Sequence, residues 1–120
     1  NQGLMALAAT VYMSLLGKNG LKQVSSLCYH KAHYAARQIQ SLSGYELWSE
    51  TPFFNEFVIR CPTTVESINE HLLEHNILGG YDLGQDYPQL TDHMLIAVTE
   101  MNSKEEIDDL VMVLAEVSND

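Results

Sequence analysis

The chain has 120 residues, of which 46% are hydrophobic, and its 16 acidic and 6 basic side chains give a net charge of −10. This length suits one domain or a part of one, and the apolar fraction is sufficient for a packed core. Because nucleic acids and anionic membrane surfaces are bound through clustered Lys and Arg, the acidic balance argues against both classes of partner.

The cysteines and the first residues of the chain bear on its compartment. Cys28 and Cys61 provide neither a disulfide framework nor the spacing of a zinc site, so we interpret them as reduced thiols of a cytoplasmic protein. The segment that begins at Asn1 lacks the basic region and cleavage site of a signal peptide. Residues 4–16 are strongly apolar but are shorter than the roughly 20 residues that span a bilayer.

Two helices are predicted at the N-terminus. Residues 4–16 are rich in Ala, Leu and Met, which favour helix, and the Gly-Lys-Asn-Gly segment at 17–20 breaks it. Residues 21–42 keep apolar side chains at helical spacing, and Gly44 is expected to cap this second helix. We expect residues 1–20 to be a linker helix from a large domain that is missing from this sequence.

The middle of the chain predicts strands around one helix. Residues 45–48 are a candidate edge strand, and residues 53–61 are dense in aromatic and β-branched side chains, which predicts a longer strand. Thr63 and Glu66 have the spacing of a capping box, and the helix they open would run to about residue 75. Four apolar side chains would form its buried stripe: Val65, Ile68, Leu72 and Leu73.

The last third of the chain predicts two more strands and a final helix. After a left-handed stop at Asn76, residues 77–81 read as a short strand, and residues 94–99 as a central strand that is apolar on both faces. Ser103 and Glu106 form a second capping box. The buried stripe of the helix that follows consists of Ile107, Leu110, Val111, Leu114 and Val117.

This order of elements predicts an α+β fold for residues 21–120. The expected architecture is a mainly antiparallel sheet of three or four strands, with helices on one face, preceded by the two N-terminal helices. The first helix has hardly any polar face, so we expect it either to associate with another copy or to fold back against residues 21–42.

The segment from His71 to His75 matches H-x-x-E-H, a pattern of zinc peptidases. On a helix the two imidazoles and Glu74 share one side, so they could bind one metal ion. A peptidase also needs a third ligand and a substrate cleft, which this short sequence hardly supplies. We therefore favour a polar helix face and expect no metal, while a small metallo-hydrolase built on His71 and His75 stays open as an alternative.

Other candidate ligands and nucleophiles are weaker. His30 and His33 lack a matching third ligand, and the aspartates at 82, 86 and 92 do not have EF-hand spacing. His30-Lys31 is similar to the His-Lys pair of many pyridoxal-phosphate enzymes, but it lies inside a predicted helix without a glycine-rich phosphate turn, which favours a solvated lysine. No nucleophile elbow, Walker loop or dinucleotide fingerprint is present, so we expect no catalytic residue.

Two short segments are candidates for an active site or an interface. Asn55 and Glu56 interrupt an apolar strand start, so one of them must point inward or toward a neighbouring surface; a hydrogen bond at the strand edge is the plainer explanation. Gly79 and Gly80, directly before Tyr81, allow either a positive φ or a close approach of the backbone to another surface.

Several segments in fixed order resemble one family. The chain is similar to the P-protein of the glycine cleavage system, and in particular to the C-terminal domain of subunit 1 of glycine dehydrogenase (decarboxylating) in its two-subunit bacterial form. The matching segments are Asn1-Gln-Gly-Leu-Met-Ala-Leu-Ala8, Phe54-Asn-Glu-Phe-Val58, Gly79-Gly-Tyr-Asp-Leu-Gly84, Asp86-Tyr-Pro88 and His93-Met-Leu-Ile-Ala-Val-Thr-Glu100.

The resemblance implies the small C-terminal domain of a fold-type I pyridoxal-phosphate enzyme. That family decarboxylates glycine on the cofactor and passes the aminomethyl group to the lipoyl arm of the H-protein. The resemblance places the Schiff-base lysine on subunit 2, which would be a partner along with the H-protein. It also implies that Asn1 and Gln2 end a loop near the active site, and that Gly79, Gly80 and Tyr81 lie near the interdomain cleft or the partner subunit.

This sequence agrees with a non-catalytic role for its own residues. None of its lysines, at 18, 22, 31 and 104, has a cofactor-binding context, so we expect no cofactor-binding residue here. Related aminotransferases hold the substrate carboxylate with a small-domain arginine, but Arg37 and Arg60 both lie outside the strand at 94–99. The alternative is a non-enzymatic α+β binding module whose contact surface is the loop at 79–88.

Overall fold

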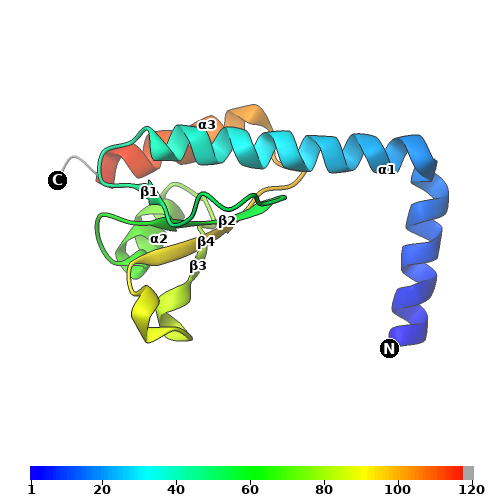
Figure 1. Cartoon of the computed structure of the whole chain (residues 1–120), viewed down its shortest axis with the longest axis horizontal. Coiled ribbons are helices and arrows are strands. Elements are labelled where there is room, and N and C mark those ends of the chain that lie inside the picture. Colours follow the sequence, from blue (N-terminus) through cyan, green and yellow to red (C-terminus); the bar gives the residue numbers. More distant parts are fainter. Residues whose placement is uncertain (118–120) are drawn as a thin grey trace.

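The computed structural model describes residues 1–117 and has four strands in one sheet with three α-helices (Figure 1). The elements in chain order are α1 (Gln2–Gln40), β1 (Glu46–Leu47), β2 (Glu56–Arg60), α2 (Val65–Glu74), β3 (Tyr81–Asp82), the 3₁₀ turns η1 (Leu83–Gln85) and η2 (Pro88–Leu90), β4 (His93–Ala97) and α3 (Lys104–Val117).

The helix α1 is bent at one glycine. Gly17 has φ 64° and ψ −175°, values outside the helical region, and helix continues on both sides of it. The predicted break is therefore confirmed, although it occupies one residue rather than all of 17–20. Residues 2–16, which we call the arm, project away from the rest of the molecule in Figure 1, and residues 1–15 are exposed. The alternative in which this helix folds back against residues 21–42 is wrong.

The second half of α1 ends earlier than predicted. The backbone N–H of Ser41 donates to the carbonyl oxygens of Arg37 and Gln38, which closes the last turn after Gln40. Gly44 has φ 82° in the turn that follows, so it is not the cap. A Cβ on Gly44 would lie 2.8 Å from Cβ of Pro62, and this close packing as well as the backbone angle requires glycine here.

The sheet is antiparallel throughout, with strand order β1-β2-β4-β3. Phe57 lies opposite Ile96 and Ile59 opposite Met94, and all four side chains are buried in the core. Buried side chains of all three α-helices belong to the same core cluster, so the helices cover one face of the sheet. The α+β class with a four-stranded antiparallel sheet is confirmed.

Three strand predictions needed correction. β2 begins at Glu56 rather than residue 53, and β3 is Tyr81–Asp82 rather than 77–81. The backbone N–H of Ile77 donates to the carbonyl of Leu72, so residue 77 still belongs to the end of α2. β4 is an inner strand as predicted, but it is buried on one face only, because its odd-numbered residues are half-buried or exposed.

The helix caps show where residue spacing alone was sufficient to predict the capping residues. Ser103 and Glu106 bond reciprocally: the N–H of Ser103 donates to Oε2 of Glu106 at 2.7 Å, and the N–H of Glu106 donates to Oγ of Ser103 at 3.1 Å. That capping box is confirmed. The first one was wrong by one position, because Thr64 caps α2 and accepts from the N–H of Ser67. Asn76 has the predicted left-handed φ, at 60°.

The buried stripes of α2 and α3 follow the predicted spacing with one exception. Val65, Ile68 and Leu72 are buried, but Leu73 is 61% exposed and does not belong to the stripe. On α3, Ile107 and Leu114 are buried, and the other predicted members pack against the core while half-buried. Within residues 1–117, no helix is both long and apolar enough to cross a membrane.

Candidate functional site

Gly79 and Gly80 lie where the chain passes between α2 and β4, and both are glycine because space is lacking. Neither has a positive φ. A Cβ on Gly79 would lie 2.0 Å from Oδ1 of Asn69, and a Cβ on Gly80 would lie 2.4 Å from the carbonyl oxygen of Leu95 and 2.4 Å from Cγ of Met94. Of the two reasons that the sequence left open, close approach is therefore the correct one.

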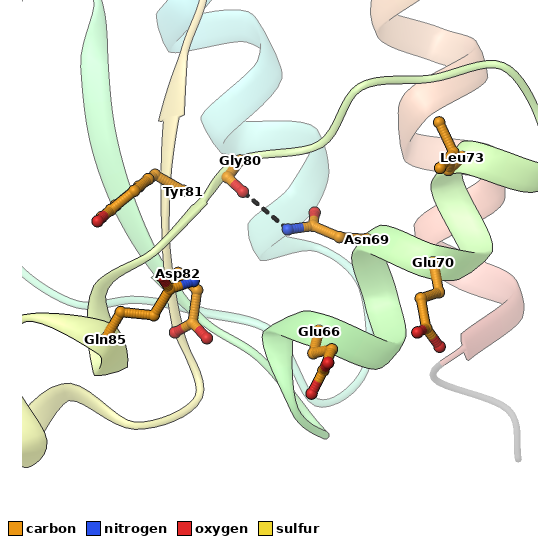
Figure 2. A pocket seen from close by; sticks show the side chains of 8 residues that line it. All are labelled: Glu66, Asn69, Glu70, Leu73, Gly80, Tyr81, Asp82 and Gln85. Carbon is orange, nitrogen blue, oxygen red and sulfur yellow. Dashed lines mark hydrogen bonds between the residues drawn. The ribbon is translucent and has the colours of Figure 1, made fainter.

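Asn69 holds this crossing in place from the side of α2. Its Nδ2 donates to the carbonyl oxygen of Gly80 at 2.9 Å, as the dashed line in Figure 2 shows. Its Oδ1 is buried and has no hydrogen-bond partner within the described part of the chain. Asn69 was not among the residues that the sequence singled out, because one Asn within a helix carries no local signal of what lies opposite it.

A depression of about 620 Å³ opens beside this crossing (Figure 2). It is lined by Glu66, Asn69, Glu70, Leu73, Gly80, Tyr81, Asp82 and Gln85. This volume suits a small ligand. Three of these eight residues carry a carboxylate and none carries a cation, so the site disfavours a phosphate or a carboxylate ligand.

Tyr81 and two aspartates shape the loop below the depression. The hydroxyl of Tyr81 donates to Oδ2 of Asp86 at 2.9 Å, and this bond to the carboxylate raises the pKa of Tyr81. Oδ1 of Asp82 accepts from the N–H of Gly84 at 2.9 Å and so caps η1. Both carboxylates therefore have structural partners in the loop.

The other sequence candidates lie apart from this depression. Asn1 accepts a hydrogen bond from the N–H of Leu4 at 2.9 Å and so caps the arm, and Gln2 is the first helical residue. Figure 1 shows this end of the chain far from the sheet. The structure therefore does not bring Asn1 and Gln2 together with Gly80 and Tyr81.

At Asn55 the structure has a hydrogen bond at the strand edge. The carbonyl oxygen of Asn55 accepts from the N–H of Val98 at 3.0 Å, which extends the pairing of β2 with β4. Asn55 is half-buried and Glu56 is exposed, opposite Ala97. Neither side chain is buried in the core, so neither needs a partner there.

The lysines do not fit a Schiff base with pyridoxal phosphate. Lys31 is not simply solvated as expected, because its Nζ donates to the carbonyl oxygens of Glu100 and Asn102 in the turn before α3. Lys104 pairs with Asp108, while Lys18 and Lys22 are exposed near the bend of α1. None of the four lines the depression.

One group of potential metal ligands lies elsewhere, on the outer side of α2 and α3. Within residues 1–117, only His71, His75 and Glu116 place three ligand atoms together, within 4.8 Å of one another. The sequence pattern contained the two histidines but not Glu116. The histidines at 30 and 33 and the aspartates of the loop belong to no such group.

Comparison with known proteins gives the family. Residues 1–114 match the model of the glycine cleavage system P-protein. This chain belongs to that family. A relative from Thermomicrobium roseum, named probable glycine dehydrogenase (decarboxylating) subunit 1, is 52% identical over 98% of the chain, and one of the same name from Anoxybacillus flavithermus is 53% identical over 97%. The chain spans about a quarter of their length, 26% in each case.

Solved structures give the same assignment for the fold. A glycine decarboxylase (P-protein) of the glycine cleavage system, in inhibitor-bound form, superposes with a TM-score of 0.87 at 29% identity, over 95% of this P-protein chain and 26% of the solved one. A phosphoserine aminotransferase from Cytophaga hutchinsonii superposes with a TM-score of 0.66 at 20% identity, which shows a shared fold alone. The fold-type I assignment is thereby confirmed.

Proposed function

We propose that this chain is the C-terminal domain of subunit 1 of a two-subunit glycine dehydrogenase (decarboxylating) in the cytoplasm. The complete enzyme would decarboxylate glycine with pyridoxal phosphate and transfer the aminomethyl group to the lipoyl arm of the H-protein. The observation that carries this proposal is the 52% identity to a named subunit 1 over nearly the whole chain.

Within that enzyme, the domain has a structural and interface role and is inactive alone. Two features support this role: its lysines are engaged elsewhere or exposed, and its depression is lined by carboxylates that would repel the cofactor phosphate. The Schiff-base lysine would then be on subunit 2. Glu66, Glu70 and Tyr81 suit a polar contact with a neighbouring domain or subunit, and the exposed arm suits an apolar one.

A chimera tests the proposal directly. The matching quarter of the Thermomicrobium roseum subunit 1 is replaced by this chain, and the chimera is produced with its partner subunit and H-protein. We expect glycine-dependent exchange of CO₂ within about tenfold of the unmodified enzyme, since half of the residues are identical. A chimera that assembles but shows no exchange would contradict the proposed function.

The role of the domain alone has a separate readout. Purified chain incubated with pyridoxal phosphate should show no Schiff-base absorbance band beyond that of free cofactor, and Lys31→Ala should not change the spectrum. A stoichiometric band that disappears in Lys31→Ala would show that this domain holds the cofactor itself.

A further inference from the structure

Two helices bring three metal-ligand side chains to one point. His71 lies in the last turn of α2 and His75 is the C-cap residue directly after that helix, while Glu116 lies on the last turn of α3, 45 residues from His71. Nε2 of His71 is 2.9 Å from Oε2 of Glu116, and Nε2 of His75 is 3.8 Å from the same oxygen. The third ligand thus comes from a part of the chain that the pattern H-x-x-E-H does not include.

The spacing of these atoms suits a zinc ion. Zinc binds His nitrogen and carboxylate oxygen at about 2.0–2.2 Å in a tetrahedron, which places two ligand atoms roughly 3.3 Å apart. The two distances to the Glu116 oxygen, 2.9 and 3.8 Å, lie on either side of this value, and all three ligand atoms lie within 4.8 Å of one another. Small rotations of the three side chains would therefore open a position for the ion. Two His and one Glu are also a ligand set that zinc uses with water as the fourth ligand.

The second nitrogen of His75 is already hydrogen-bonded, and that of His71 has a carboxylate nearby. Nδ1 of His75 lies 3.0 Å from the carbonyl oxygen of His71. A carbonyl oxygen can only accept, so Nδ1 carries a proton and Nε2, on the side of Glu116, is the nitrogen that remains for a metal ion. Nδ1 of His71 faces Oε2 of Glu74 at 3.9 Å. Carbonyl and carboxylate partners of this kind hold metal-binding imidazoles in position.

We propose that His71, His75 and Glu116 bind a divalent transition-metal ion of the zinc class, with water as the fourth ligand. The ion would tie α3 to α2 at the surface of the domain. Exposed fractions of 30% for His71 and 51% for Glu116 leave room for entry, and the net charge of −10 attracts cations. This site goes beyond the proposed function, and it departs from the sequence expectation of no metal, which rested on the lack of a third ligand.

Calorimetric titration of zinc chloride into the purified 120-residue chain tests the site. We expect saturable one-to-one binding, and a higher thermal unfolding midpoint with zinc, because the ion binds the folded arrangement. His71→Ala, His75→Ala and Glu116→Gln should each weaken binding at least tenfold. His30→Ala and Glu105→Gln remove an exposed imidazole and an exposed carboxylate away from the site, and they should keep the affinity of the unmodified chain.

Cobalt(II) as the probe separates this site from binding at Cys28 or Cys61. We expect the visible bands of a tetrahedral nitrogen and oxygen environment without intense thiolate charge transfer, and their loss in His75→Ala. Circular dichroism shows which variants fold, and Glu116→Gln carries the test if a histidine variant does not. Thiolate-type spectra, unchanged affinity in Glu116→Gln, or the absence of saturable binding would each overturn the proposal.

Discussion

Gly79 and Gly80 are required by the side chains and backbone around them, since neither has a backbone angle that other residues avoid. Their Cβ positions are already filled, on one side by Asn69 of α2 and on the other by β4. The close fit lets Asn69 reach the carbonyl of Gly80 and fixes the entry of the chain into β3. Gly79 and Gly80 were candidates for a functional site in the sequence, and the packing around them explains why both are glycine.

A double-mutant cycle tests this reason. Gly79→Ala should lower the free energy of unfolding by about 1–3 kcal/mol, as overpacking does. In the Asn69→Ala background the added cost should be smaller, because Oδ1 is gone and only the flexible end of Leu72 remains close, at 2.9 Å. Urea denaturation measures both. Gly3→Ala, in the exposed arm, is the matched control and should be neutral or slightly stabilising; equal costs in the two backgrounds would refute the explanation.

Cys61 gives the fold a dependence on alkaline pH. Burial, and next the charge of Asp92, raise the pKa of its thiol from 9.0 to about 12. An unfolded thiol loses its proton near pH 9 while the folded one keeps it, so this group lowers stability as the pH rises from about 9 to 12. We expect Cys61→Ala to lose stability less steeply than the unmodified chain in urea denaturation across that range. A slope that is the same in both chains would contradict the assignment.

At the scale of elements, α3 contributes to the core through one stripe and leaves its other side to solvent. Ile107 and Leu114 are 3% and 0% exposed, whereas Met112 is 59% exposed on the same helix. Leu110, at the middle of the predicted stripe, is half-buried against the core. The buried side chains of α3 should therefore contribute more to the free energy of unfolding than the half-buried members of the stripe.

Truncation along α3 should follow this difference. Leu114→Ala should cost about 2–5 kcal/mol of stability, the range for a large side chain removed from a packed core. Leu110→Ala should cost less than Leu114→Ala, and Met112→Ala, the matched control, less than about 0.5 kcal/mol. The midpoints of chemical denaturation give the ranking. If Met112→Ala cost as much as Leu114→Ala, the assignment of the faces would be wrong.

At the scale of the whole molecule, most apolar side chains of the arm are exposed. Seven large apolar side chains of the arm are between 48% and 81% exposed: Leu4, Met5, Leu7, Val11, Tyr12, Met13 and Leu15. An apolar surface of this kind is usually covered by another domain or chain. In the proposed enzyme, the large domain or the partner subunit would cover the arm. The division of the chain into a linker helix at residues 1–20 and a small domain at residues 21–120 stays a prediction, and residues 118–120 lie outside the described part.

The isolated chain should therefore self-associate through its arm. Sedimentation velocity should show oligomers that increase with concentration, and Leu7→Glu combined with Val11→Glu should return the chain to a monomer. Asn19→Glu, beyond the bend, adds the same kind of charge outside the arm and should leave the association unchanged. An unmodified chain that stays monomeric at high concentration would contradict this prediction.

Much of the fold was predictable because its signals are local. The bend at Gly17, the left-handed Asn76 and the reciprocal cap of Ser103 and Glu106 depend only on residues close in sequence. The predictions were wrong where backbone conformation or tertiary packing, rather than local spacing, determines the role of a residue. Thr63 and Thr64 have similar chemistry, and only the backbone conformation at the start of α2 selects Thr64 as its cap. Leu73 fits the spacing of the stripe, yet 61% of it is exposed.

The sequence by itself determined the family, the α+β class and the order of the elements, because apolar periodicity, capping residues and motif order are properties of the chain alone. Only the tertiary structure decided which residues meet. It placed Asn69 against Gly79 and Gly80, Lys31 against the turn before α3, and Glu116 beside His71 and His75. These contacts join residues 10 to 71 positions apart in the sequence, and local patterns carry no information about which distant residues meet.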